Sequence, residues 1–132
     1  MAILIDEKTK VIIQGITGRE AVTFTRGMLD YGTKVVAGVT PGKEGQQVYG
    51  VPVYGCVKTA MKNHQINTSI VSVPPRFAKD ATFEAIDAGI KLINVFTERI
   101  PRADVIEMTV FAKHRGARII GPNSLGMVSP GK

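Results

Sequence analysis

Short runs of β-branched residues alternate with helix-like patterns along this chain, and glycine or proline follows nearly every run. The apolar runs predict strands at residues 10–14, 34–39, 51–53, 68–73, 91–96 and 117–120. The patterns between them predict helices at residues 18–31, 56–63, 77–88 and 101–116, the last with Pro101 at its first position. Strands that alternate with helices are joined by βαβ crossovers. The sequence therefore predicts an α/β fold, a Rossmann-type, doubly wound and mainly parallel sheet in a single domain over residues 1–132.

Composition limits where the protein works. The chain has 132 residues, 44% of them hydrophobic, which is enough for one buried core. Its single cysteine, Cys56, excludes an intramolecular disulfide and favours a reducing compartment. Charge interrupts the amino terminus at Asp6, too early for a secretory signal, and no apolar run approaches the ~20 residues that span a membrane. We expect a cytoplasmic protein (mitochondrial matrix in a eukaryote) without membrane contact.

The net charge of +6 indicates an anionic partner. The basic residues are spread along the chain and lack the interleaved aromatics that stack on bases, so an anionic small ligand is favoured over a nucleic acid. No cluster of residues suggests a metal site. His64 and His114 lie at predicted helix ends, and Cys56 has no histidine near it in sequence. We expect a binding domain that has no catalytic residues of its own.

The predicted fold determines where a ligand lies. In open α/β sheets, ligands bind beyond the carboxyl ends of the strands, near the point where the strand order reverses. Glycine or proline is present in most of the loops that follow the strands, and tight turns of this kind let backbone amides approach a phosphate closely. The candidate loops are residues 15–20, 39–45, 73–76, 96–99 and 121–126.

The first of these loops resembles a phosphate-binding turn. Gly15-x-x-Gly18 follows a predicted strand and opens a predicted helix, so backbone N–H groups and the helix dipole point at one spot. The dinucleotide fingerprint G-x-G-x-x-G is absent, because Thr17 and Glu20 stand at its second and third glycines. Thr17 and Glu20 also fit a capping box, with Thr17 as the N-cap. The backbone amides can bind phosphate while these side chains shape the turn.

The second loop bears on the choice of cofactor. An NAD-binding domain places an acid at the end of its second strand for the ribose hydroxyls, but residues 35–41 contain none. The turn Pro41-Gly42 instead carries Lys43, and a lysine there favours a phosphorylated ribose or a diphosphate, as in NADP or coenzyme A. The alternative for Lys43 is a solvated loop cation.

Two further loops flank the same edge. The proline pair at residues 74–75 lacks N–H donors and makes a rigid apolar wall that suits an adenine face or a pantetheine arm. Glu98 can accept hydrogen bonds from an adenine amino group or a hydroxyl, or it can pair with Arg99 or Arg102. The candidate cofactor-binding residues are Thr17, Gly18, Arg19, Glu20, Pro41, Lys43, Val73, Pro74, Phe96, Thr97 and Glu98.

Several gapless blocks are shared with a known family: residues 3–6, 10–18, 31–34, GVTPGK at 38–43, EAIDAGIK at 84–91, and IIGPN at 119–123. On these blocks the whole chain resembles the N-terminal, CoA-binding domain of the succinyl-CoA synthetase α subunit. The resemblance implies CoA contacts from residues 17–20, from Lys43 and from residues 96–98. It also implies that a phosphohistidine in a downstream domain and a nucleotide-binding β subunit complete the reaction of succinate, CoA and a nucleoside triphosphate.

The chain departs from the family pattern at two places: the first bears on the CoA phosphates, and the second leaves the acid substrate open. Arg19-Glu20-Ala21 replaces the small or polar residues, ending in glycine, that the family carries after Thr-Gly, and Ser124-Leu125 replaces Cys-Pro. A malate–CoA ligase or an NDP-forming acyl-CoA synthetase would fit the same domain. Two other functions remain as alternatives: a stand-alone CoA-binding sensor or scaffold, and an NADP-binding redox domain.

Overall fold

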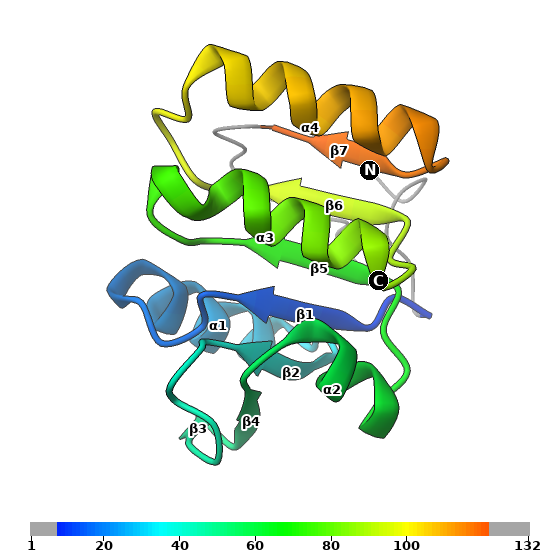
Figure 1. Cartoon of the computed structure of the whole chain (residues 1–132). Coiled ribbons are helices and arrows are strands. Elements are labelled where there is room, and N and C mark those ends of the chain that lie inside the picture. The colour runs from blue at the N-terminus through cyan, green and yellow to red at the C-terminus, as the bar shows by residue number, and fades with distance from the viewer. Residues whose placement is uncertain (1–7, 122–132) are drawn as a thin grey trace.

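The computed structural model describes residues 8–121 (Figure 1). The first half of this range contains β1 (Val11–Gln14), α1 (Arg19–Tyr31), β2 (Val35–Val39), β3 (Gln47–Val48), β4 (Val51–Tyr54) and α2 (Val57–Asn63). The second half contains β5 (Thr68–Val71), α3 (Pro75–Asp87), β6 (Leu92–Val95), α4 (Arg102–His114) and β7 (Arg118–Ile120).

These strands form one sheet in the order β3-β4-β2-β1-β5-β6-β7. Every neighbouring pair is parallel except β3 and β4. From β1 the chain winds outward first to β2 and β4, and then to β5, β6 and β7 on the other side. The strand order therefore reverses between β1 and β5, and the predicted doubly wound, mainly parallel sheet is confirmed.

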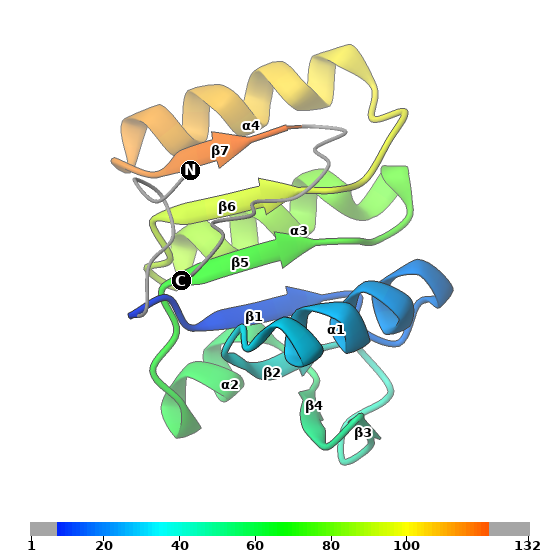
Figure 2. The ribbon, with the colours of Figure 1, turned by 180° about the vertical axis from the view of Figure 1, so that it is seen from behind.

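Helices cover both faces of the sheet. The helices α2, α3 and α4 lie on one face and α1 lies on the other, as Figures 1 and 2 show from opposite sides. Two core clusters match these layers. One joins β-strand residues such as Ile12 and Ile93 to α2, α3 and α4, and the other joins Ile13 and Ile70 to α1. All four residues of β1 are buried because both faces of the strand are covered.

A buried network of hydrogen bonds, centred on Gln14, crosses the layer between the sheet and α3. Gln14 is only 2% exposed, and its Nε2 donates to the carbonyl of Ala81 in α3 at 2.7 Å. The Ser69 hydroxyl of β5 donates to Gln14 Oε1 at 2.6 Å. Both ends of the amide are thus satisfied inside the core, as a buried polar group requires. These hydrogen bonds connect β1 and β5 to α3.

Several predicted boundaries were wrong by one or two residues. The helix predicted at residues 77–88 begins at Pro75, since a proline has no N–H to lose at the first helical position. Pro101, predicted as that position in α4, is instead the N-cap, and the helix begins at Arg102. The strand predicted at 68–73 ends at Val71.

The hairpin of β3 and β4 was not predicted. Its two-residue turn, Tyr49-Gly50, has φ values of 50° and 84°, which is the type I′ geometry of tight hairpins. A strand of only two residues, Gln47–Val48, is too short to give a periodic signal. Within the described residues, no helix is long and apolar enough to cross a membrane.

Replacing Ser69 tests the buried hydrogen-bond network of Gln14. In Ser69→Ala, Gln14 Oε1 loses its donor in the core, so we expect the free energy of unfolding to fall by about 1–3 kcal/mol. Urea denaturation followed by circular dichroism measures it. Thr109→Ala is the matched control, because that hydroxyl is exposed and bonds only within its own helix; it should change stability by no more than about 0.5 kcal/mol. Equal losses in both variants would contradict this role for Ser69.

Candidate functional site

The carboxyl edge of the central strands is held together by a close approach at Gly15. This glycine follows β1 and has φ +89°, and its N–H donates to the Val39 carbonyl at the end of β2 at 2.7 Å. A Cβ atom at this position would overlap the backbone carbonyl of Ser72, just beyond β5. Only glycine therefore lets the loops after β1, β2 and β5 meet at the point where the strand order reverses.

Thr17 joins the first loop to the second. Its hydroxyl lies 3.1 Å from the Thr40 hydroxyl, and its N–H donates to the same oxygen at 3.4 Å. The predicted capping box is wrong, because Gly18 is the N-cap of α1 and no side chain caps the helix. Thr17 instead bonds across to the neighbouring loop. Glu20 is exposed in the first turn of α1, where an acid is favoured by the positive end of the helix dipole.

The amino terminus of α1 presents backbone donors at this edge. The Gly18 N–H is used within the turn, where it donates to the Gly15 carbonyl at 3.0 Å. The first amides of a helix have no acceptor within the helix, and in α1 these include the amides of the exposed residues Arg19 and Glu20. Gly18, Arg19 and Glu20 are all exposed. This set of donors suits an anion more than any one side chain does.

Lys43 stands on a rigid turn in the second loop. The Lys43 N–H donates to the Thr40 carbonyl at 3.0 Å, and Gly42 between them has φ +86°. Pro41 and a left-handed glycine in these positions form a type II turn. Pro41 and Lys43 are both exposed, and no carboxylate pairs with Lys43 within the described range. The turn therefore holds a cation in fixed backbone geometry beside the first loop.

Thr97 ties the third loop to the fourth. It is 7% exposed, its hydroxyl donates to the Val73 carbonyl at 2.9 Å, and the same oxygen accepts the Val73 N–H at 3.1 Å. Phe96 is half-buried and packs edge-on against Phe24 of α1, with ring centroids 5.1 Å apart. Both side chains support the loops from within. Val73 is half-buried and Pro74 is exposed beside them.

Glu98, in the fourth loop, is an exposed acid at this edge. Within residues 8–121, it forms no ion pair with Arg99 or Arg102, the partners that the sequence suggested. Arg99 has φ 61°, a left-handed conformation that turns the chain sharply after Glu98. Of the last predicted loop, residues 121–126, only Gly121 falls in the described range, so Ser124 and Leu125 lie outside it.

Four of the five predicted loops therefore meet at one edge. The sequence reasoning missed Thr40 and Ser72, which make the contacts between loops. The sequence indicated Thr40 only weakly, by its position between a predicted strand and the Pro41-Gly42 turn. Nothing in the sequence indicated Ser72, because it contributes a backbone carbonyl. That carbonyl packs against Gly15, which is far away in the sequence.

The other candidate groups have local roles. Cys56 is the N-cap of α2, and a hydrogen bond from the Thr59 hydroxyl, 3.1 Å away, lowers the pKa of its thiol. His64 lies at the other end of α2 and its Nε2 is 2.9 Å from the Tyr54 hydroxyl. In the described part of the chain, no three His, Cys, Asp or Glu side chains are grouped as metal ligands.

Known proteins resemble this chain in sequence. The family described as "CoA binding domain" matches residues 6–99. The chain is 54% identical over all 132 residues to subunit alpha 2 of the ADP-forming succinate–CoA ligase of Archaeoglobus fulgidus, and covers 46% of that subunit. It is 48% identical over 130 residues, 98% of this chain, to a subunit of an ADP-forming sulfoacetate–CoA ligase of Acholeplasma sp, and covers 44% of it. The chain thus spans about half the length of these relatives.

A solved structure supports the fold. ATP citrate lyase from Methanothrix soehngenii, in complex with citrate and coenzyme A, superposes with a TM-score of 0.79 at 21% identity. The match covers 92% of this chain and 22% of that chain. At this identity the likeness concerns the backbone arrangement alone.

Replacing Gly15 tests the close approach. In Gly15→Ala the new Cβ overlaps the Ser72 carbonyl, so we expect a loss of stability at least about 2 kcal/mol greater than in the control Gly50→Ala. Gly50 also has a positive φ, of 84°, but nothing lies within 4 Å of its Cβ position, so its loss reports the backbone conformation alone. Chemical denaturation measures both. Similar losses of stability in the two variants would contradict the role proposed for the close contact between Gly15 and Ser72.

Proposed function

We propose, on the premise that this chain belongs to the CoA-binding domain family, that it is the CoA-binding part of an ADP-forming acid–CoA ligase. Coenzyme A is the ligand of this family, and it carries an ADP moiety with a diphosphate and a phosphorylated ribose. The observation that carries the proposal is the joining of four loops at the carboxyl edge, where backbone donors and Lys43 stand together. This is where an open α/β sheet binds its ligand.

Phosphate recognition is assigned to the first two loops. The amides of Arg19 and Glu20 and the positive end of the α1 dipole suit the diphosphate. Lys43 suits the phosphate on the ribose, because its turn holds it at the β2 side of the edge. The Arg19 side chain adds positive charge. Glu20 stays exposed to solvent, which screens its repulsion of the phosphates.

The remainder of CoA is assigned to the third and fourth loops. Val73, Pro74 and Phe96 offer an apolar path for the adenine or the pantetheine arm, since prolines and aromatic rings present surface without N–H donors. Glu98 is exposed beside them and suits a hydroxyl or amino group of the ligand. In this assignment Thr17 and Thr97 position the loops, and their hydroxyls are engaged with the protein itself.

CoA binding is one of several tasks in the ligase reaction. From the resemblance to succinyl-CoA synthetase, we assign activation of the acid to a phosphohistidine in a further domain, and nucleotide binding to a β subunit. The task of this domain is then to present the CoA thiol to the activated acyl group. The two relatives named above act on succinate and sulfoacetate, both small acids with a second anionic group. We propose a substrate of that class, and the cytoplasm as the location.

Titration calorimetry with CoA tests the binding site. Lys43→Ala should weaken CoA binding about tenfold or more, because a charge-assisted bond to phosphate contributes about 1.5–3 kcal/mol. Dephospho-CoA lacks the phosphate on the ribose, so it should bind the variant and the unchanged protein alike. Lys113→Ala removes the same charge from an exposed site on α4 and should leave the affinity within about twofold.

The same titrations separate the alternatives. A folded protein that binds no CoA at millimolar concentration would contradict the proposal. Tighter binding of NADP than of CoA would favour a redox domain. If the loss in Lys43→Ala persists with dephospho-CoA, Lys43 contacts the diphosphate instead of the ribose phosphate.

An activity assay tests the proposed reaction. The complete natural protein, combined with its β subunit, should release ADP from ATP only when CoA and a small dianionic acid are both present. Coupled detection of ADP with succinate, sulfoacetate and acetate as substrates measures this. CoA binding without any acid-dependent ADP release would favour a sensor or scaffold.

A further inference from the structure

The loop between β6 and α4 crosses the carboxyl edge of the sheet, toward which the parallel strands point in Figure 1. Phe96, at the start of this loop, packs with the core cluster on the α1 face, and Ile100, at its end, packs with the cluster on the face of α3 and α4. Between them Thr97 is buried and bonded to the loop after β5. The loop is therefore fixed on both faces of the sheet, which leaves Glu98 and Arg99 exposed where the chain passes over the end of β6.

Arg99 holds a backbone conformation that favours glycine. Its φ of 61° lies in the left-handed region, where the Cβ atom of an L residue comes too close to the following carbonyl oxygen. Glycine would make this turn without that crowding. Residues held in such conformations often serve a function, because the side chain must repay the unfavourable backbone geometry. The presence of arginine at this position therefore indicates a role for its guanidinium.

The Arg99 guanidinium is not used by the fold. Among residues 8–121, no carboxylate forms an ion pair with it, although Glu98 is its neighbour in sequence. Arg115 differs in this respect, since it donates to Asp87 at 3.2 Å and connects the end of α4 to α3. A guanidinium offers five donors, and those of Arg99 stand in an exposed loop at the edge where the ligand is expected.

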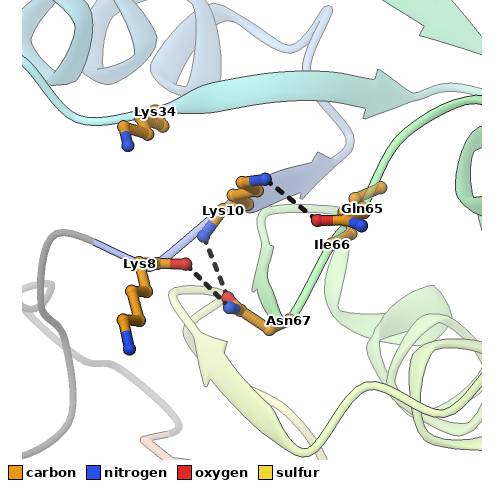
Figure 3. Close-up of a pocket in the computed structure, with 6 residues that line it drawn as sticks. All are labelled: Lys8, Lys10, Lys34, Gln65, Ile66 and Asn67. Atoms are coloured by element: carbon orange, nitrogen blue, oxygen red, sulfur yellow. Dashed lines mark hydrogen bonds between the residues drawn. The ribbon is translucent and has the colours of Figure 1, made fainter.

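Another exposed cation shows what a structural role looks like. At the opposite, amino edge of the sheet, Lys10 lines a cavity together with Lys8 and Lys34 (Figure 3). Its Nζ lies 3.1 Å from Gln65 Oε1, and its backbone N–H donates to Asn67. Lys10 is thus engaged with the protein through both backbone and side chain, whereas the structure assigns no such bond to the Arg99 side chain within the described range.

We propose that Arg99 is a further ligand-binding residue of the CoA site and binds a phosphate group of CoA. This inference rests on the proposed function and adds a residue to it. The planar guanidinium fits phosphate oxygens with two parallel hydrogen bonds, and it keeps its charge at any physiological pH. An exposed, flexible arginine on a fixed loop can turn toward the ligand without any movement of the backbone.

The strand order places Arg99 and Lys43 on opposite sides of the helix amides assigned to the diphosphate. The order β2-β1-β5-β6 has Lys43 after β2, the start of α1 after β1, and Arg99 after β6. Two strand spacings, about 10 Å, separate the ends of β1 and β6. A ligand as long as CoA, lying across this edge, therefore meets a cation from each side.

The alternative for Arg99 is a solvated loop cation, and one variant separates the two roles. Arg99→Gly removes the charge and also relieves the left-handed conformation, so either role predicts a melting temperature higher by about 2–4 °C. Only a contact with phosphate predicts that the more stable variant binds CoA less well. A gain in stability together with a loss of affinity is therefore the expected result.

Calorimetric titration with CoA at about 0.1 M salt measures the affinity, since long-range attraction to the net charge is largely screened there. We expect it to fall about fivefold or more in Arg99→Gly and in Arg99→Asn, because asparagine also tolerates the left-handed region but carries no charge. Arg99→Lys keeps the charge and should stay within about threefold of the unchanged protein.

Two matched controls accompany these variants. Arg118→Gln removes the same charge at the start of β7, at the amino edge, and should change the CoA affinity less than about twofold. Tyr49→Gly relieves a left-handed conformation, with φ 50°, in the hairpin turn before β4, and should leave the affinity equally unchanged. An affinity loss in either control equal to that of Arg99→Gly would overturn the inference.

The ligand series identifies the group that Arg99 contacts. A loss of affinity that persists with dephospho-CoA supports a contact with the diphosphate, and a loss that disappears supports a contact with the ribose phosphate. An equal loss with pantetheine, which has no phosphate and is measured by displacement of CoA, would overturn the assignment. Unchanged CoA affinity in Arg99→Gly and Arg99→Asn would overturn this inference and leave the proposed function intact, whereas no CoA binding by the unchanged protein would overturn both.

Discussion

The close approach of Gly15 to the backbone at Ser72 is the constraint on which the carboxyl edge depends. It places the loop after β1 against the loop after β5, at the reversal of strand order, while the Gly15 N–H bonds the end of β2. A parallel sheet aligns strand ends but does not by itself bring their loops into contact. Here the missing side chain at Gly15 allows that contact. The bonds of Thr17 and Thr97 then connect the outer loops to this centre.

At this edge, some side chains hold the loops together, while backbone amides remain available to a ligand. Two threonines within the candidate set use their hydroxyls for bonds between loops, so their side chains serve geometry. The exposed side chains at the edge include Arg19, Glu20, Lys43 and Glu98, beside the first backbone amides of α1. Backbone donors in fixed loops lose little conformational freedom when a ligand binds, which favours affinity for a phosphate-rich ligand.

The polarity of the fold gives its two edges different electrostatics. Crossover helices in a parallel α/β sheet begin at the carboxyl edge and end at the amino edge, so their positive ends gather where a cofactor phosphate is expected. The negative ends of these helices lie at the amino edge, where Lys34 follows the end of α1. Basic residues lie at both edges, with Lys43 in the loop after β2 and Lys10 directly before β1.

The sequence by itself determined the α/β layers, the strands other than β3 to within a few residues, and the loops that form the candidate site, because hydrophobic period and glycine or proline breaks are local signals. It also placed Lys43 on its turn, since Pro-Gly geometry is local. Only the tertiary structure decided that Thr17 bonds Thr40 instead of capping α1, that Thr97 is buried against Val73, and that Lys8, Lys10 and Lys34 share one cavity. Thr17 and Thr40 lie 23 residues apart, and Val73 and Thr97 lie 24 residues apart, so only chain folding brings each pair within hydrogen-bonding distance.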